Sequence, residues 1–498
     1  MALNTTRLPP IVPDPVKIKP RGTNTVVHPF DPVDLNASVW FPAAIGKSSV
    51  RSPNEVVPYI DGHPAFKDMV AAIRTANKRG HFIYLLGWRL ITDFALIPGD
   101  GTSTIEALFK AASSRNVDIR AMLYHQNTKL SGEDNTPAIT FINSLSNGAA
   151  IHDDRVVKGG LLVELKASYL GVHHQKVLIV NGAEGLIAFQ GGMDINSDRL
   201  QFSGPIGLHD VHVRLRGLAA GSLWALFIER WKDHPQSVKF QPIPAQVTGP
   251  ANVTDDLQVE IGRTYPNSTK HTLFGGGGPY HFAAAGDQSA KVLVLNAIAR
   301  AKNFIYIEDQ YLFDMSISNA LKAALPNLKK LVILITLSVQ AADQHQTISR
   351  RRDFIDNLTG KAPLPTSKVI VCQNKFPDLP FVHSKTFIFD DKFAIIGSAN
   401  INRRGYTHDS EQNAGIFDTN KKKRFFFAHE LRMHLWAKHL SKRPIDMVDP
   451  IASSVHWTKP VGKIVTYVVA GQDPPQPFPE NIVPNDLIWN IGLDPDGT

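Results

Sequence analysis

The chain of 498 residues contains a single cysteine, Cys372, so no disulfide can form within it. It has no apolar run approaching the ~20 residues that a bilayer-spanning helix requires. Its first twenty residues lack the apolar core of an ordinary secretory signal. These absences argue against a disulfide-stapled domain and an integral membrane protein, and they predict no cleaved signal peptide.

Acidic residues are somewhat fewer than basic residues. The chain has 53 Lys and Arg against 45 Asp and Glu, which gives a net charge of +8. A basic protein favours anionic partners, and both lipid headgroups and nucleic acids meet that description. Hydrophobic residues make up 43% of the chain, as in ordinary globular proteins, and the length indicates two or more domains.

Two stretches of the chain carry the same arrangement of polar and small residues. The first stretch contains His174, Lys176, Asn181, Gly191, Gly192 and Asp194. The second stretch contains His383, Lys385, Asp390, Gly397, Ser398 and Asn400. Each pairs a histidine with a lysine two residues later, and each continues through an apolar run to a turn of small residues.

The residues after each His-x-Lys motif are apolar and rich in β-branched side chains, so both motifs are predicted to lie on strands. Side chains two residues apart on a strand share a face, so each motif would present one imidazole and one ammonium together. Two edge strands with incidental polar residues are the alternative. Because two copies agree in type and spacing, we favour one active site built from two halves and suited to phosphodiester chemistry.

A repeated order of elements surrounds the motifs. A helix followed by a strand at 71–84 recurs at 296–306, and a further strand at 117–124 recurs at 331–337. An aromatic-rich helix closes each unit. Because alternating strands and helices are typical of α/β architecture, we predict two pseudo-symmetric α/β/α sandwich lobes with the active site at their interface.

The predicted boundaries follow from this repeat and from composition. The two lobes are expected at 51–240 and 286–445. The flanking segments are expected to be a Pro-rich N-terminal arm at 1–50, a linker at 241–285 and a C-terminal extension at 446–498.

The sequence matches known metal-binding and nucleotide-binding motifs only incompletely. Four glycines at 275–278 lack the Gly-Lys-Ser/Thr that completes a phosphate-binding loop. His429 and His434 are spaced one residue too far apart for the zinc-binding His-Glu-x-x-His helix. We therefore expect no metal and no cofactor.

The two motifs resemble the paired His-x-Lys-x4-Asp motifs of the phospholipase D superfamily. The second copy matches in full, whereas Asn181 stands where the family has an Asp that supports the motif and breaks no bond. The segments at 306–312, 209–217 and 431–440 resemble the eukaryote-like phospholipase D branch. The resemblance spans roughly residues 55 to 445.

Phosphodiester cleavage at such a site has two chemical requirements. A neutral imidazole attacks phosphorus and forms a phosphohistidine, and a protonated imidazole supplies a proton to the leaving alkoxide. By resemblance, His174 is the nucleophile and His383 the acid, although the sequence itself leaves the opposite order open. Lys176 and Lys385 would supply positive charge to the phosphoryl oxygens without a metal.

The resemblance also implies a carboxylate for each histidine, supplied from the strand that follows the other motif. Asp210 is then expected to support His383, and Glu411 to support His174, with Asp409 as the competitor of Glu411. Four further residues are expected to bind or position phosphoryl oxygens: Gly192, Asp194, Ser398 and Asn400. Asn181 and Asp390 are expected to support the motifs.

The expected function is therefore hydrolysis or transphosphatidylation of glycerophospholipids at a membrane surface. One alternative is a nuclease or other phosphodiesterase with the same site, and another is a catalytically weak protein that binds phospholipid or nucleic acid. We expect a monomer with no calcium requirement. It would be cytoplasmic, or exported without a cleaved signal peptide as an antibacterial effector could be, and would contact membranes peripherally.

Overall fold

The structure is a computed structural model. It describes residues 37–42, 49–124, 134–153, 155, 171–200, 207–243, 253, 255–267, 280–336, 344–374, 380–418, 426–458 and 464–466. Most of the expected N-terminal arm, the glycines at 275–278 and the end of the expected C-terminal extension lie outside the described residues.

The first lobe is built on a seven-stranded sheet with the order β2-β9-β7-β6-β3-β4-β5. Its strands are β2 (Asn54–Ile60), β3 (Phe82–Gly87), β4 (Asp118–Tyr124), β5 (Gly148–Asp153), β6 (Val177–Gly182), β7 (Gly185–Gly191) and β9 (Val211–Gly217). The β3-β4-β5 part is parallel, and the remaining pairs are antiparallel. The helices of this lobe are α1 (Gly62–Thr75), α2 (Ile105–Ser113), α4 (Thr136–Ser144) and α5 (Leu218–Asp233).

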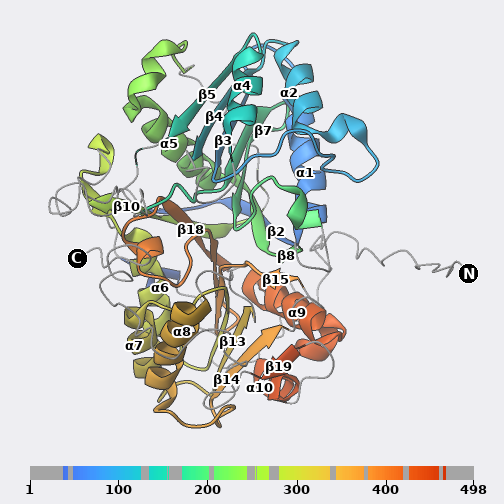
Figure 1. The fold of residues 1–498 in the computed structure, drawn as a ribbon. Coiled ribbons are helices and arrows are strands. Elements are labelled where there is room, and N and C mark those ends of the chain that lie inside the picture. The colour runs from blue at the N-terminus through green and yellow to red at the C-terminus, as the bar shows by residue number, and fades with distance from the viewer. Residues whose placement is uncertain are drawn as a thin grey trace, which may run out of the picture.

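The second lobe repeats this plan with the strand order β10-β18-β17-β16-β12-β13-β14. Its strands are β10 (Leu257–Asn267), β12 (Phe304–Asp309), β13 (Lys330–Thr336), β14 (Val369–Asn374), β16 (Thr386–Phe389), β17 (Phe393–Gly397) and β18 (Glu411–Asp418). Its helices are α6 (Ser289–Arg300), α7 (Met315–Ala324), α8 (Gln344–Thr359) and α9 (Phe427–Leu440). The predicted α/β architecture of two similar lobes is confirmed, and Figure 1 shows one lobe above the other.

The range expected to be a linker contains a long strand of the second lobe. β10 pairs with β18 along eight residues and takes the place in its sheet that β2 takes in the first lobe. Leu257, Val259 and Ile261 are buried and alternate with polar residues, which is the period-two pattern of a strand. The expectation of a linker from 241 to 285 is therefore wrong at β10, where the period-two alternation outweighs the neighbouring Pro and Gly.

Both chain ends also contribute to the second lobe. β1 (Val50–Arg51) pairs with β10, and β19 (Ile464–Thr466) pairs with β14 at the opposite edge of the sheet. Two short helices, α10 (Pro450–Ser453) and α11 (Val455–Thr458), precede β19. A short strand from the middle of the chain, β11 (Ala285–Asp287), also pairs with β10. Trp40 stacks on Phe393, and Trp457 is fully buried. The described parts of the two arms are therefore packed structure.

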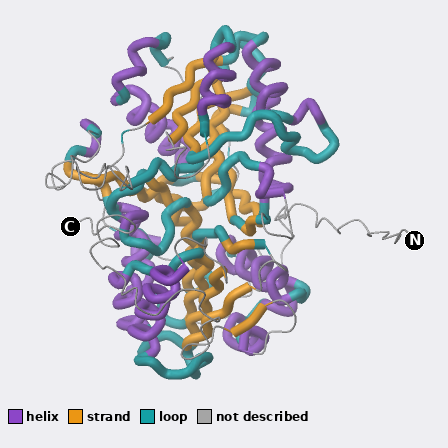
Figure 2. The backbone as a smooth tube through the Cα atoms, viewed as in Figure 1, coloured by secondary structure: helices purple, strands orange, loops and turns teal. Residues whose placement is uncertain are grey.

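Apolar packing explains why the lobes hold a fixed relation. α1, α2 and α4 cover one face of the first sheet, and α6, α7 and α8 cover one face of the second. Helices α5 and α9 lie in one core together with residues of both sheets. Phe227 and Trp231 of α5 and Trp436 of α9 belong to this core. Figure 2 shows the strands inside each lobe with helices around them.

A two-stranded parallel ladder lies between the lobes. β8 (Leu208–His209), just before β9, pairs with β15 (Phe381–Val382), just before the second motif. Within the described ranges, none of the helices combines the length and apolar character that crossing a membrane requires. Cys372 is buried on β14, and burial raises the pKa of its thiol to about 12, as expected for an inert thiol.

Candidate active site

The two His-x-Lys motifs lie immediately before regular strands. β6 begins at Val177 and β16 begins at Thr386, one residue after each motif lysine. The prediction that the motif residues themselves form the strands is therefore wrong by a few residues. Each motif comes just before its strand enters the sheet, at the boundary between the lobes. The motif histidines therefore face the opposite lobe.

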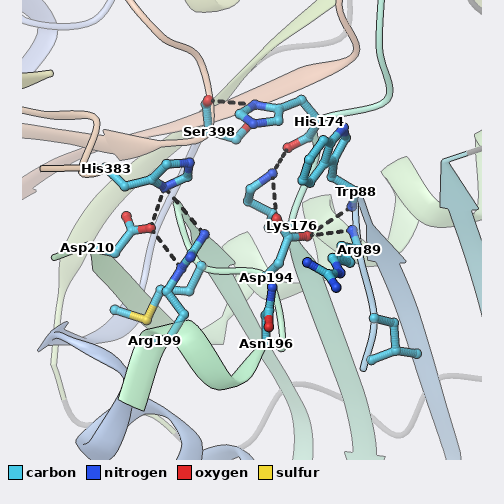
Figure 3. Close-up of polar contacts among 12 residues, drawn as sticks. Trp88, Arg89, His174, Lys176, Asp194, Asn196, Arg199, Asp210, His383 and Ser398 are labelled. Atoms are coloured by element: carbon cyan, nitrogen blue, oxygen red, sulfur yellow. Dashed lines mark hydrogen bonds and ion pairs between the residues drawn. The ribbon is translucent and has the colours of Figure 1, made fainter. Parts of the chain in front are cut away.

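The two motif histidines face each other across the lobe interface. Their ring centroids are 6.4 Å apart, and the planes are inclined at 62° (Figure 3). The side chain of His174 is 13% exposed and that of His383 is 14% exposed. Each imidazole therefore keeps a small exposed area at which it can reach a phosphoryl group.

Each histidine contacts a carboxylate from the opposite lobe. His174 Nδ1 lies 2.9 Å from Glu411 Oε1, and His383 Nδ1 lies 2.7 Å from Asp210 Oδ2. Both carboxylates are fully buried. Because a carboxylate faces each Nδ1, we assign the proton of the neutral ring to Nδ1, which leaves Nε2 for the chemistry. The Lys385 ammonium also lies 3.0 Å from His383 Nδ1.

The backbone makes the two crossings equivalent. The His174 N–H donates to the carbonyl of Ser410 at 3.0 Å, and the His383 N–H donates to the carbonyl of His209 at 2.8 Å. Ser410 precedes Glu411 as His209 precedes Asp210. An equivalent backbone hydrogen bond therefore holds each histidine against its carboxylate.

The lysines approach the histidines from their own lobes. Lys176 Nζ donates to the carbonyl of His174 at 2.9 Å and lies 3.0 Å from Asp194 Oδ2. Lys385 Nζ donates to the carbonyl of His383 and lies 3.4 Å from Gln310 Oε1. Burial lowers the pKa of Lys385 to about 7, so its charge is sensitive to pH and to a bound anion.

Three of the four residues expected to bind phosphoryl oxygens hold other site groups instead. Asp194 pairs with Lys176 and accepts hydrogen bonds from the backbone N–H groups of Trp88 and Arg89 (Figure 3). The Ser398 hydroxyl donates to Glu411 Oε2, and the Ser398 carbonyl lies 3.1 Å from His174 Nδ1. These contacts orient the machinery.

Gly192 holds the machinery through its lack of a side chain. A Cβ at this position would lie 1.9 Å from Asp210 Oδ1, so glycine is required for that carboxylate to reach His383. Asn400 is 5% exposed, and its Oδ1 makes no hydrogen bond to any residue that the structure describes. Asn400 therefore stays the predicted contact for a phosphoryl oxygen or its proton.

The last residue of each motif lies far from the reacting groups. Asp390 accepts hydrogen bonds from the backbone N–H groups of Lys302, Asn303 and Phe304 at 2.7–2.8 Å. Asn181 occupies the equivalent position, opposite Phe82 on β3. Five residues of strand separate it from Lys176 and span about 16 Å, so it supports the far end of β6.

Asp409 does not take the place of Glu411. It accepts a hydrogen bond from the Val172 N–H at 2.8 Å and lies 3.2 Å from Arg404 Nε. Burial raises the pKa of Asp409 to about 6 and that of Glu411 to about 7. Burial followed by the neighbouring lysines holds the pKa of both motif histidines well below the ordinary value.

Sequence reasoning missed two side chains at the site. Arg199 is almost fully buried, with Nε 3.3 Å from Asp210 Oδ2 and Nη2 3.5 Å from His383 Nδ1 (Figure 3). Trp88 lies edge-on to His174, with ring centroids 6.4 Å apart. Trp88 directly follows the parallel strand β3, a position where ligands often bind in α/β sheets, and that signal could have located it. Nothing in the local pattern around Arg199 pointed to the site.

The fold and the site together define a duplicated α/β protein with one two-histidine, two-lysine centre shared by its lobes. Two family models match the chain, "Phospholipase D" over residues 72–205 and "Cardiolipin synthase, PLD-like domain" over residues 294–430. The chain belongs to the phospholipase D superfamily.

The similar proteins include plant enzymes and a bacterial structure. Phospholipase D alpha 1 of Carica papaya is 23% identical over 79% of this chain and 66% of its own length, just under two thirds. Phospholipase D alpha 1 of Zea mays is 23% identical over 90% of this chain and 72% of its own length. The crystal structure of phosphatidylserine synthase from Haemophilus influenzae Rd KW20 is similar in fold. It has a TM-score of 0.54 and 13% identity, and covers 83% of this chain and 87% of its own.

Proposed function

We propose that this protein transfers the phosphatidyl group of a glycerophospholipid to water or a small alcohol and releases the headgroup. The observation that carries the proposal is the convergence of two imidazoles, each backed by a buried carboxylate from the opposite lobe. Two such imidazoles can divide one difficult displacement at phosphorus into two easier steps.

In the first step, His174 Nε2 attacks phosphorus. A P–N bond forms and the P–O bond to the headgroup breaks. Burial and then the neighbouring cations lower the pKa of His383, but the bound anionic phosphodiester offsets those cations, so His383 is protonated in the complex and gives its proton to the departing alkoxide. Lys176 and Lys385 lie beside the two rings and offset the charge that builds on the phosphoryl oxygens. Glu411 accepts from His174 Nδ1–H and stabilises the positive charge that the attacking ring acquires.

In the second step, His383 is neutral and acts as the base. It removes a proton from water or an alcohol, whose oxygen attacks phosphorus while the P–N bond to His174 breaks. The product is phosphatidic acid, or a phosphatidyl alcohol where an alcohol attacked. His174 returns to its neutral form, and His383 returns to its protonated form supported by Asp210.

Two facts favour a lipid over a nucleic-acid substrate. The plant relatives named phospholipase D match across more than three quarters of this chain. The segments at 209–217, 306–312 and 431–440, which resemble the eukaryote-like branch, lie on or directly beside β9, β12 and α9. The net charge of +8 suits an anionic surface but does not distinguish lipid from nucleic acid.

A headgroup-release assay on phosphatidylcholine and phosphatidylethanolamine vesicles, run beside a single-stranded DNA degradation assay, tests the proposal. Release of headgroup by the wild-type chain, its loss in His383→Ala and its retention in the exposed control His281→Gln are expected. DNA degradation without lipid turnover would favour the nuclease. Binding to both substrates without turnover of either would favour a binding protein.

A further inference from the structure

A second cluster of charged side chains lies behind one half of the site. At its centre is His209, the residue before Asp210, with a side chain that is 2% exposed. Its Nδ1 lies 2.7 Å from Asp61 Oδ1, and its Nε2 lies 3.0 Å from Glu308 Oε2. Asp61 belongs to the first lobe and Glu308 to β12 of the second, so this one imidazole bridges carboxylates from both lobes.

Helix α9 completes the cluster. The Lys438 ammonium contacts Asp61 Oδ2 and lies 2.7 Å from His209 Nδ1, so two cations share one carboxylate. His439 Nε2 lies 2.9 Å from Glu308 Oε1. The Tyr306 hydroxyl donates to the same oxygen at 2.7 Å.

The charges of the cluster balance when His209 is protonated. Burial and then the Lys438 ammonium lower the pKa of His209, but Glu308 and Asp61 together outweigh both and raise it. His209 and Lys438 then offset Asp61 and Glu308, which is the condition under which such charges are tolerated inside a protein. Each carboxylate oxygen named above has a donor.

The position of the cluster connects it to the acid half of the site. His209 is the second residue of β8 and pairs with Val382 of β15. Its carbonyl accepts a hydrogen bond from the His383 N–H. This ladder is two residues long on each side. Asp210 must cross between lobes to reach His383, and so the register of a very short ladder sets their 2.7 Å contact.

The other half of the site is built differently: among the described residues, the charged group behind it, Asp153 with Arg155 and Arg230, contacts His173 and lies within the first lobe. Ser410 occupies the position equivalent to His209, pairs with His173, and contacts His173 Nδ1 through its hydroxyl at 2.9 Å. The pseudo-symmetry of the backbone is therefore broken by side chains at this position. A charged bridge between lobes supports Asp210, whereas a neutral hydroxyl precedes Glu411.

We propose that His209 is a positioning residue that clamps the two lobes so that Asp210 holds His383 in the geometry of a proton donor. This role deepens the proposed function and rests on it. His209 touches neither substrate nor the reacting atoms and acts through Asp210. Loss of the clamp impairs proton transfer, so it lowers kcat and leaves KM nearly unchanged.

A metal ion is the competing occupant of this cluster. Ligand atoms of His209, Glu308 and His439 lie within 4.8 Å of one another, which is close enough to hold one. The Lys438 ammonium beside them already supplies positive charge, and an added divalent ion would leave the cluster with excess charge. The clamp therefore requires a proton on His209 and no metal.

The test uses the full chain with His209→Gln, which keeps hydrogen-bonding atoms but cannot be charged. We expect kcat on phosphatidylcholine vesicles to fall at least about tenfold, with KM within about twofold. The matched control is His429→Gln. His429 is also a buried histidine, but it lies on α9. It contacts the Val448 carbonyl at 2.8 Å and Asp391 at 3.6 Å, away from the site. This control should retain wild-type kcat.

A double-mutant cycle separates positioning from general destabilisation. In an Asp210→Asn background, adding His209→Gln should cost little further activity, because both changes remove one function. Equal fold losses in both backgrounds would overturn the clamp, and so would unchanged kcat in His209→Gln. A stoichiometric metal bound by wild-type protein and lost from His209→Gln, with chelator-sensitive activity, would also overturn it.

Hydrogen exchange provides a readout that needs no turnover. Peptides containing Val382 and His383 should exchange faster in His209→Gln than in wild type, and at the wild-type rate in His429→Gln. Unchanged exchange there would reject the clamp even if the wild-type chain cleaved no lipid. Inactive wild-type protein with faster exchange in His209→Gln would reject the proposed function and retain the clamp.

Discussion

Replacing Glu411 with Gln should make the protein more stable at alkaline pH and much less active. The carboxyl is fully buried, lies 2.9 Å from His174 Nδ1, and accepts a hydrogen bond from the Ser398 hydroxyl. Burial raises its pKa from the ordinary 4.5 to about 7. Gln has the same shape and keeps an acceptor oxygen for His174, so the variant removes the charge and little else.

The magnitude follows from proton linkage. A raised carboxyl pKa means that the folded state binds this proton more tightly than the unfolded state. The free energy of unfolding therefore falls as the pH rises from about 4.5 to about 7 and stays low above that. A shift of about 2.5 units at 1.36 kcal/mol each is about 3 kcal/mol. The Glu411→Gln variant lacks this decline.

Thermal unfolding at pH 5 and pH 8 measures the effect. The wild-type midpoint should fall relative to that of the variant by several degrees between these pH values. Turnover of the variant at pH 8 should drop about 100-fold, because no charge stabilises the attacking His174 ring. A variant that is less stable than wild type at pH 8, or that keeps full turnover, would refute the reasoning.

Three further predictions concern the same centre. His174→Ala and His383→Ala should each lower turnover by about 1,000-fold or more in folded protein, and the double variant should lose little more because both residues serve one reaction; substantial activity in either would contradict a two-histidine site. The pH profile of kcat/KM should be narrow, because Glu411 is ionised only above about 7, Lys385 is charged only below about 7, and burial and the neighbouring cations hold the pKa of the acid His383 low; the bound phosphoryl group should move the alkaline limb of kcat to higher pH, and a flat profile from pH 6 to 9 would count against these groups. Asn181→Asp should change the rate tenfold or less, about 1.4 kcal/mol in barrier height, because this residue lies at the far end of β6 from Lys176; a gain of several orders of magnitude would indicate that the natural protein is a weak catalyst.

The residues that sequence reasoning located are those that carry a local pattern. The paired His-x-Lys motifs stand out because each precedes an apolar run and a small-residue turn, and the repeat of helix and strand predicted two α/β lobes. The structure brings Asp210 and Glu411 to the opposite lobes' histidines, as the family resemblance implied.

The features that were missed depend on contacts between distant parts of the chain. The partners of His209 are far from it in sequence, at 61, 308 and 438, and no local pattern links them. Arg199 follows the first motif without regular spacing and reaches His383 only through the lobe interface. β10 was missed for another reason: its period-two alternation lies between Pro-rich and Gly-rich segments that suggest a linker.

The roles expected for Ser398 and Asp194 illustrate a further limit. Both occupy motif positions beside the histidines, and the sequence indicates that they are near the substrate. It cannot show which way each side chain turns. The structure turns Ser398 to Glu411 and Asp194 to Lys176, so both support groups that do the chemistry.

Trapping the covalent intermediate tests the central claim most directly. Enzyme mixed with phospholipid labelled in its phosphatidyl group is denatured rapidly at mildly alkaline pH, because acid hydrolyses the P–N bond of a phosphohistidine, and is then digested and mapped by mass spectrometry. Our account predicts a phosphatidyl adduct on the peptide that contains His174 and none on the peptide that contains His383. An adduct on His383 would reverse the assigned roles, and full turnover with no adduct on either histidine would contradict the two-step mechanism.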